Sequence, residues 1–226
     1  MATSLDLQEQ EQVDALKAFW KQYGNLITWV LTLALAAFAA WNGWQWYERD
    51  QAAKAGAIYD ELDRAVQAGD AQRAARAFGD LRDRHAGSTF AAHGALLVAK
   101  LQADEGQADA ARASLAWVVG EAGDEALRAV ARLRLAGLLI EAGDHGAALE
   151  HLAAIGDPAF APLAADRRGD ALMAQGKAAE ARTAWEAAWA GMDERLDYRR
   201  LVEAKLAAIG AAPAASAPPA VEGAAR

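Results

Sequence analysis

The positions of charged residues divide the chain into segments with different hydrophobic patterns. No charged residue lies between Lys21 and Glu48, so the whole stretch 22–47 is uncharged. This stretch is longer than the ~20 apolar residues that a helix needs to cross the hydrocarbon core of a bilayer. Tryptophan and tyrosine flank it at both ends: Trp20, Tyr23, Trp41, Trp44, Trp46 and Tyr47. Because these side chains prefer the membrane–water interface, the pattern predicts a transmembrane helix over residues 25–47.

A cleaved signal peptide is the alternative interpretation of this run, because Ala37-Phe38-Ala39 matches the small-x-small pattern of a signal-peptidase site. The hydrophobic region of a signal peptide is typically only ~7–15 residues long and follows a short basic segment. Here the preceding segment, 1–24, carries four acids and two bases, so we expect a retained anchor. A core helix of a soluble protein would seldom stay uncharged over this length. Basic residues occur on both sides of the run, so the positive-inside rule gives no orientation.

Residues 9–24, in front of the anchor, have the period of an amphipathic helix. Apolar residues recur there at steps of three and four: Val13, Leu16, Trp20 and Tyr23. This spacing places them on one helix face, while Lys17 and Lys21 can extend toward lipid phosphates. We expect these apolar residues and Lys17 to contact the lipid bilayer or the membrane helices of a partner. A solvated lead-in to the anchor is the alternative.

Beyond residue 50 the chain is rich in alanine and poor in valine, isoleucine and threonine, which favours helices over strands. The expected fold is all-α, with one N-terminal transmembrane helix followed by a helical domain over residues 48–209. Helices are expected at 51–68, 71–84, 89–105, 107–121, 125–142, 146–154, 159–175, 177–190 and 194–209. The final segment, residues 210–226, is rich in alanine and proline and is expected to be disordered.

Four glycines in this domain separate predicted helices at near-regular intervals: Gly69, Gly106, Gly143 and Gly176. An alanine stands five residues after each glycine, and a large apolar residue stands nine after it: Phe78, Leu115, Leu152 or Trp185. A small residue stands seven before three of them, with Leu62 as the exception. Glycine closes a helix in the left-handed conformation, and a helix–turn–helix period of roughly 34 residues is typical of tetratricopeptide repeats. We expect a tetratricopeptide-like solenoid; an irregular bundle of helical hairpins is the alternative.

Composition and charge exclude several functional classes. The net charge is −8 and no basic stripe is present, which argues against nucleic-acid binding. The absence of cysteine excludes disulfides and thiolate metal sites, and it is compatible with an oxidising compartment. No catalytic or phosphate-binding motif is present, so we expect no enzyme activity, no cofactor and no metal.

One rival hypothesis is an enzyme site that combines His93, Asp166 and Asp170. The two aspartates are spaced i, i+4 and could share a helix face. Paired carboxylates on a helix are usually solvated, and Arg167 and Arg168 stand between these two. We therefore do not expect a catalytic role for them.

A stacked helical repeat offers a concave surface that can hold another polypeptide. In tetratricopeptide domains generally, the first helix of each unit lines that surface. The turn glycines set the register and give these candidate lining residues: Tyr59, His93, Leu96, Leu133, Ile140, Leu163 and Met173. With Asp63, Asp166 and Asp170 beside them, they predict a mixed apolar and acidic groove for an extended or unfolded polypeptide. Burial in the core between helices is the alternative for each of these side chains.

The tail, the anchor and the repeats together resemble the ancillary SecYEG translocon subunit family (YfgM type) of Gram-negative bacteria. The resemblance rests on the tail pattern EQxxALKxFWKxxG and on an anchor that ends in GWQWY. The matching positions are Glu11, Gln12, Leu16, Lys17, Trp20, Gly24, Gly43 and Trp44. It implies an inner-membrane protein with a cytoplasmic tail over residues 1–24 and a periplasmic repeat domain.

The partners that this resemblance implies are the SecYEG translocon, a membrane-anchored periplasmic peptidyl-prolyl isomerase-like chaperone, and unfolded or nascent polypeptides. The implied role is to help transfer secreted proteins to the periplasmic chaperone network. A membrane-anchored adaptor for another cell-envelope assembly machine is the alternative. Such an adaptor would share the repeat domain but would not need this tail.

Overall fold

The structure is a computed structural model that describes residues 7–212. Every regular element within that range is a helix and none is a strand, which confirms the all-α prediction. In chain order the helices are α1 (Leu7–Gln67), α2 (Ala71–His85), α3 (Thr89–Asp104), α4 (Ala108–Glu121), α5 (Glu125–Glu141), α6 (His145–Ala153), η1 (Pro158–Phe160), α7 (Ala161–Ala174), α8 (Ala178–Gly191) and α9 (Asp197–Ala208). Apart from residues 210–212, the tail that we expect to be disordered lies outside the described residues.

The first helix, α1, unites segments that the sequence pattern treated as separate. The amphipathic stretch 9–24, the apolar run and the first repeat helix belong to one helix of 61 residues. Three glycines lie inside it without ending it, because none of them adopts the positive φ that closes the other helices. The chain divides within α1 into two compact units, Met1–Lys54 and Ala55–Arg226, and each is described by itself below.

In the first unit, the apolar part of α1 lies on the surface. This helix is the one in the described residues that is long and apolar enough to cross a membrane, with a mean hydropathy of 1.6 over its most apolar window. Only 6% of that window is buried, whereas a core helix of a soluble protein would bury most of it. Its two threonines bond to the backbone of the helix itself: Thr28 Oγ1 donates to the carbonyl of Gly24, and Thr32 Oγ1 donates to that of Thr28, both at 2.7 Å. Such internal bonding suits a segment in lipid, where no water is available.

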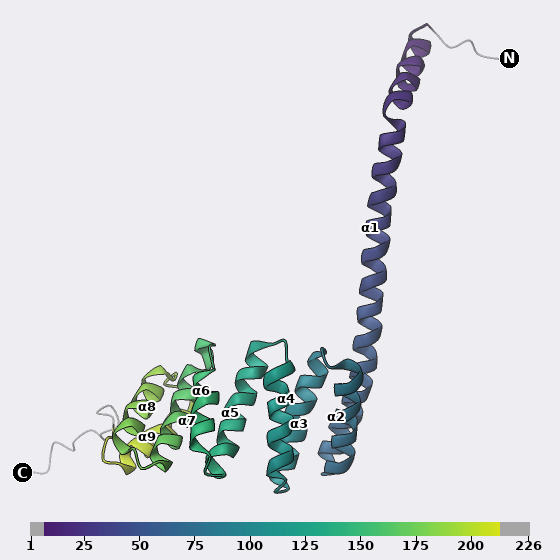
Figure 1. The fold of residues 1–226 in the computed structure, drawn as a ribbon. Helices are drawn as coiled ribbons and strands as arrows, with labels where there is room; N and C mark the ends of the chain where they lie inside the picture. The colour runs from purple at the N-terminus through teal and green to yellow at the C-terminus, as the bar shows by residue number, and fades with distance from the viewer. Residues whose placement is uncertain (1–6, 213–226) are drawn as a thin grey trace, which may run out of the picture. The chain divides into compact units, whose positions relative to one another are not determined.

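The second unit is a row of helical hairpins (Figure 1), and the two helices of each hairpin are joined by the same type of turn. The four repeat glycines have φ between 69° and 82°. At the first of them, the N–H of Asp70 donates to the carbonyl of Ala65 at 2.9 Å, and the N–H of Gly69 donates to that of Val66 at 3.0 Å. The same pair of hydrogen bonds closes α3, α5 and α7, and it satisfies carbonyls that a helix end would leave free.

Gly210, with φ of 73°, closes α9 in the same way, about one repeat length after Gly176. The sequence pattern did not single out this fifth turn. It places α9 in register with α3, α5 and α7, as the first helix of a further unit. Within the described residues, no second helix follows it.

The aligned columns of the repeat form the contact between the two helices of each hairpin. The alanines five residues after the glycines are fully buried: Ala74, Ala111, Ala148 and Ala181. The large residues nine after the glycines are also buried: Phe78, Leu115, Leu152 and Trp185. Gly169 on α7 accommodates the large Trp185 in this contact, because a Cβ on the glycine would lie 2.3 Å from Nε1 of the indole. Gly94 has a similar role between neighbouring hairpins, since a Cβ on it would lie 2.9 Å from Cδ1 of Leu62 on α1.

The helices form two layers. From α2 onward successive helices pack against each other, and contacts also join α3 to α5 and α5 to α7 across the intervening helix. The first helices of the hairpins therefore lie next to one another in one layer, as in tetratricopeptide domains. Two helices begin later than predicted. The helix predicted over 159–175 starts as a short 3-10 helix at Pro158, and α7 follows it. The last helix, α9, begins at Asp197 rather than at residue 194.

Candidate functional site

A groove with a volume of about 470 Å³ runs along the layer of first helices. The helices that contribute to it are α3, α5, α7 and α9, with Leu115 from α4 behind them. Its lining residues are Ala99, Lys100, Ala103, Asp104, Leu115, Leu133, Arg134, Gly137, Leu138, Glu141, Leu163, Arg167 and Tyr198. Side chains from three repeat units and from the last helix thus converge on one open surface.

The groove combines an apolar floor with charged edges. Leu133, Leu138 and Leu163 supply apolar surface from α5 and α7. Three cations and two carboxylates line it, so the charged part of the mixed apolar and acidic groove that we predicted is not acidic. Lys100 forms an ion pair with Asp104 at 2.5 Å.

The lining guanidinium of Arg134 is held by the backbone rather than by an acid. Its Nη1 donates to the carbonyl of Leu96 at 3.1 Å. Among the described residues no carboxylate lies within ion-pair distance of it.

Of the seven predicted lining residues, Leu133 and Leu163 line the groove. Leu96 is buried in the core, and Ile140 is half-buried against that core. Tyr59 packs on Phe90 in a tilted arrangement, with ring centroids 5.5 Å apart. The remaining two, His93 and Met173, are exposed and do not line this groove.

Eleven of the thirteen groove residues were not predicted from the sequence, among them Arg134, Arg167 and Tyr198. A signal for the two arginines was present, because each stands nine residues before its turn glycine, Gly143 or Gly176. That register places both on the same face of successive first helices. Tyr198 carried no comparable signal, since the fifth turn at Gly210 was not recognised.

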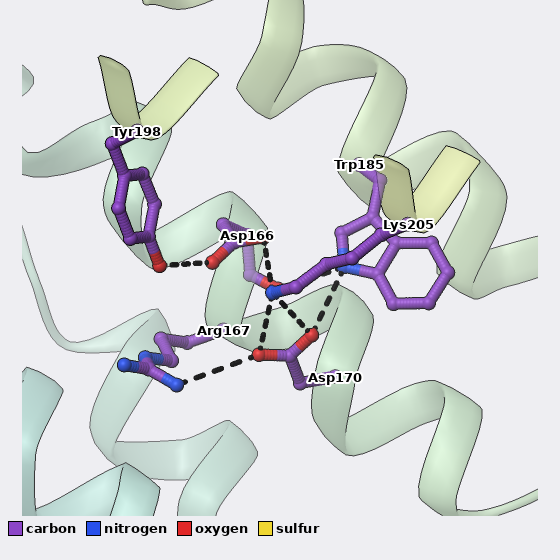
Figure 2. Close-up of polar contacts among 6 residues, drawn as sticks. All are labelled: Asp166, Arg167, Asp170, Trp185, Tyr198 and Lys205. Carbon is purple, nitrogen blue, oxygen red and sulfur yellow. Dashed lines mark hydrogen bonds and ion pairs between the residues drawn. The ribbon is translucent and has the colours of Figure 1, made fainter. Parts of the chain in front are cut away.

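A buried polar cluster lies beside this groove and joins α7, α8 and α9 (Figure 2). Asp166 on α7 is fully buried. Its carboxylate accepts hydrogen bonds from Lys205 Nζ and from the Tyr198 hydroxyl, each at 2.7 Å. Lys205 Nζ also donates to both oxygens of Asp170, at 2.7 and 2.9 Å. Trp185 Nε1 donates to the Asp166 carbonyl at 3.1 Å and to Asp170 Oδ1 at 3.2 Å.

These contacts overturn the expectation that the pair Asp166 and Asp170 is solvated. Lys205 forms an ion pair with both carboxylates, and Arg167 approaches Asp170 at 3.6 Å. Burial, together with the bond to Asp166 and its charge, raises the pKa of Tyr198 from 10.0 to about 12. Because the carboxylates are saturated, the cluster offers no free general base. No contact joins it to His93 within the described residues, and its evident role is to hold α9 against α7 and α8.

The candidate membrane and translocon contacts on α1 are all on its surface. Val13, Leu16, Trp20 and Tyr23 are exposed, and the exposed Lys17 pairs with Asp14 at 3.3 Å. Phe19, which the predicted stripe did not include, is also exposed and packs on Tyr23 at 5.1 Å between ring centroids. The aromatic surface of this segment is therefore wider than a single stripe.

Comparison with known proteins gives the same assignment along most of the chain. The tetratricopeptide repeat-like domain family matches residues 17–211. The ancillary SecYEG translocon subunit of Escherichia coli (strain K12) is 32% identical over 181 residues, which cover 79% of this chain and 86% of that protein. The chain belongs to the ancillary SecYEG translocon subunit family. The resemblance drawn from the tail and anchor motifs is thereby confirmed.

Two further members of the family are similar over comparable lengths. The ancillary SecYEG translocon subunit of Neisseria gonorrhoeae (strain ATCC 700825 / FA 1090) is 29% identical over 201 residues, 88% of this chain and 96% of the relative. The protein of the same description from Haemophilus influenzae (strain ATCC 51907 / DSM 11121 / KW20 / Rd) is 26% identical over 182 residues, 80% and 89% of the two chains. Alignments that cover so much of the chain extend beyond the predicted repeat domain, 48–209.

Proposed function

We propose that this protein is a single-pass inner-membrane ancillary subunit of the SecYEG translocon. Its repeat domain binds polypeptides or chaperones and helps transfer secreted proteins to the periplasmic chaperone network. The observation that carries the proposal is the groove of about 470 Å³ on the layer of first helices. It occurs in a chain with one membrane-length apolar segment in its described part and with relatives named as translocon subunits.

The proposed mechanism is proximity rather than chemistry. An anchor near the translocon raises the local concentration of the groove around an emerging chain, so that weak contacts suffice for capture. The mixture of leucine side chains and charges in the groove suits a polypeptide segment with both apolar and polar residues. No cofactor and no bond chemistry enter this mechanism.

The proposed orientation has the N-terminal tail in the cytoplasm and the repeat domain in the periplasm. The family resemblance supports it, and the absence of cysteine is compatible with an oxidising periplasm. A membrane-anchored periplasmic peptidyl-prolyl isomerase-like chaperone is the proposed neighbour. The surface of Val13, Leu16, Lys17, Trp20 and Tyr23 is the proposed contact with the bilayer or with the translocon.

The test is exchange of the tail combined with crosslinking inside the membrane. Residues 1–24 are replaced by a neutral sequence of equal length, and a photo-reactive residue replaces Trp29 or Trp44. In the otherwise unchanged protein we expect adducts to translocon subunits or to the membrane-anchored chaperone, and we expect the tail exchange to reduce the translocon adducts. A matched control carries the Leu133→Asp change in the groove, which should leave the membrane adducts intact.

Two results would contradict the proposal. The absence of translocon adducts from the otherwise unchanged protein would favour an adaptor for another envelope machine. A protein that begins near Ala40 and is recovered free of the membrane would mean that residues 25–47 act as a signal peptide, and the assignment to the translocon would fall.

A further inference from the structure

The charged residues on the groove layer are not distributed evenly along the repeats. The position nine residues before each turn glycine is occupied, in order, by Asp60, Leu97, Arg134 and Arg167. This column is acidic on α1 and basic on α5 and α7. Because first helices of successive units are neighbours, the column forms a gradient of charge along the layer.

The acidic end consists of Asp60 and Asp63 beside Tyr59. Within the described residues neither carboxylate has a cation at ion-pair distance, and Asp63 accepts a hydrogen bond at 2.6 Å from Gln67. Burial and then the charges of Asp63 and Asp60 raise the pKa of Tyr59. Tyr59 packs on Phe90 of α3, so this end adjoins the next first helix.

The basic end consists of Arg134 and Arg167, which both line the groove. Arg134 is held through one nitrogen by the Leu96 carbonyl at 3.1 Å, which leaves its other N–H groups for a ligand. Arg167 has a long contact of 3.6 Å with Asp170, a carboxylate that Lys205 already engages at 2.7 and 2.9 Å. Neither guanidinium is therefore saturated by an acid of its own chain, while Glu141 is the nearby lining carboxylate without an ion pair in the described residues.

We propose that the groove, together with the acidic end on α1 beyond its lining residues, selects extended polypeptide segments that carry an acidic and a basic residue about six positions apart, with apolar residues between them. The first helices of neighbouring units pack about 10 Å apart, so α1 and α5 lie about 20 Å apart across α3. An extended chain advances about 3.3 Å per residue, and about six residues cover that distance. The acidic residue meets Arg134 and Arg167, the basic residue meets Asp60 and Asp63, and the leucines of the groove contact the apolar part. This inference rests on the proposed function and adds the chemistry of the bound segment.

The test measures peptide binding to the full-length protein in lipid nanodiscs by fluorescence anisotropy. The probe is a labelled short apolar peptide with one lysine and one glutamate about six positions apart. Companion peptides of the same length carry the two charges next to each other, or carry two lysines, or carry none. We expect the widely spaced peptide to bind about three- to tenfold more tightly than its companions, and we expect this difference to shrink as salt screens the charges.

Protein variants assign the preference to named side chains. Arg134→Gln and Asp60→Asn should each lower the affinity for the widely spaced peptide about three- to tenfold, as expected for partly exposed charge-assisted bonds. Neither change should alter the affinity for the uncharged peptide. Glu141→Gln should strengthen binding slightly, because it removes a like charge from the glutamate side. The control is Arg182→Gln on α8, whose partner Glu186 lies outside the groove.

The outcomes separate this inference from the proposed function. Equal binding of all four peptides, abolished by Leu133→Asp, would overturn the charge preference while polypeptide binding in the groove stands. Binding that Leu133→Asp does not affect, or the absence of any binding, would overturn both.

Discussion

The pairing of Gly169 with Trp185 shows how a single side chain sets the helix contact of one repeat. In the second and third units an alanine faces a leucine at the equivalent positions. In the fourth unit the large Trp185 faces Gly169, which has no Cβ. The indole also donates hydrogen bonds to Asp166 and Asp170, so its size and its N–H group are both used. A larger residue on one helix is thus matched by a smaller one on the other.

We expect Gly169→Ala to destabilise the protein by about 1–3 kcal/mol, because the new Cβ would overlap the indole and core overpacking has this cost. The free energy of unfolding is measured by urea titration of the protein in detergent micelles. Gly120→Ala on α4 is the control, since nothing lies within 4 Å of its Cβ position and alanine favours the helix. Adding Trp185→Leu to Gly169→Ala should restore part of the loss, and strict additivity of the two changes would contradict this packing account.

The raised pKa of Tyr198 predicts a pH dependence of stability at high pH. The folded state favours the neutral phenol, because burial and the charge of Asp166 raise its pKa to about 12. Its contribution is therefore complete below pH 10, where the phenol is neutral in the unfolded chain too, and it is lost as the pH rises through 12. Stability of the original protein should fall more steeply over pH 10–12 than that of Tyr198→Phe, as followed by thermal unfolding. Parallel profiles for the two proteins would contradict this assignment.

At the scale of a helix, α9 depends on long-range polar contacts to an unusual degree. It has two fully buried apolar side chains, Val202 and Leu206, and no second helix of its own unit packs against it in the described residues. Lys205 and Tyr198 compensate by bonding to Asp166 and Asp170 on α7. Tyr198 also lines the groove, so a displacement of α9 would remove this side chain from the groove lining.

We expect Lys205→Met to cost about 3–5 kcal/mol, because it leaves the fully buried Asp166 without its cation. Hydrogen exchange should increase mainly in α7 and α9 and much less in α2–α4. Lys100→Met is the matched control, since Lys100 and Asp104 are both exposed and such surface pairs contribute about 0–1 kcal/mol. A uniform loss of protection over all helices would argue against a local role of the cluster.

At the scale of the whole molecule, the signals that were readable in the sequence are local ones. The four hairpins were predicted from a glycine at a helix end and from small and large residues at fixed distances from it. This was possible because each of these signals acts within one turn or one pair of helices. The bond from Lys205 to Asp166 joins positions 39 apart in the chain, and nothing near either residue indicates the partner. The unbroken course of α1 was missed because the charge and hydrophobic patterns divide this part of the chain into segments, although no helix-ending turn separates them.

We expect the protein to stay in the membrane with its original N-terminus, because residues 25–47 are predicted to form an uncleaved transmembrane helix. Mass spectrometry of the purified protein should find a chain that retains residues 1–24. Alkaline carbonate washing should leave it in the pellet. Replacing Leu31 and Leu35 with lysine should release the repeat domain into the soluble fraction, whereas replacing the exposed Leu201 of α9 with lysine should not.

The turn at Gly210 implies that the repeat array is modular at its C-terminal end. Since α9 ends with the same backbone geometry as α3, α5 and α7, a helix grafted after residue 211 with the alanine and leucine spacing of α4 would complete a fifth hairpin. Because all these turns have the same geometry, a gene duplication or deletion that runs from one turn glycine to the next would add or remove one complete repeat. Such a change would not interrupt a helix. Length variation among related chains should therefore occur in whole hairpins, and an alignment that compares the intervals between turn glycines would detect it.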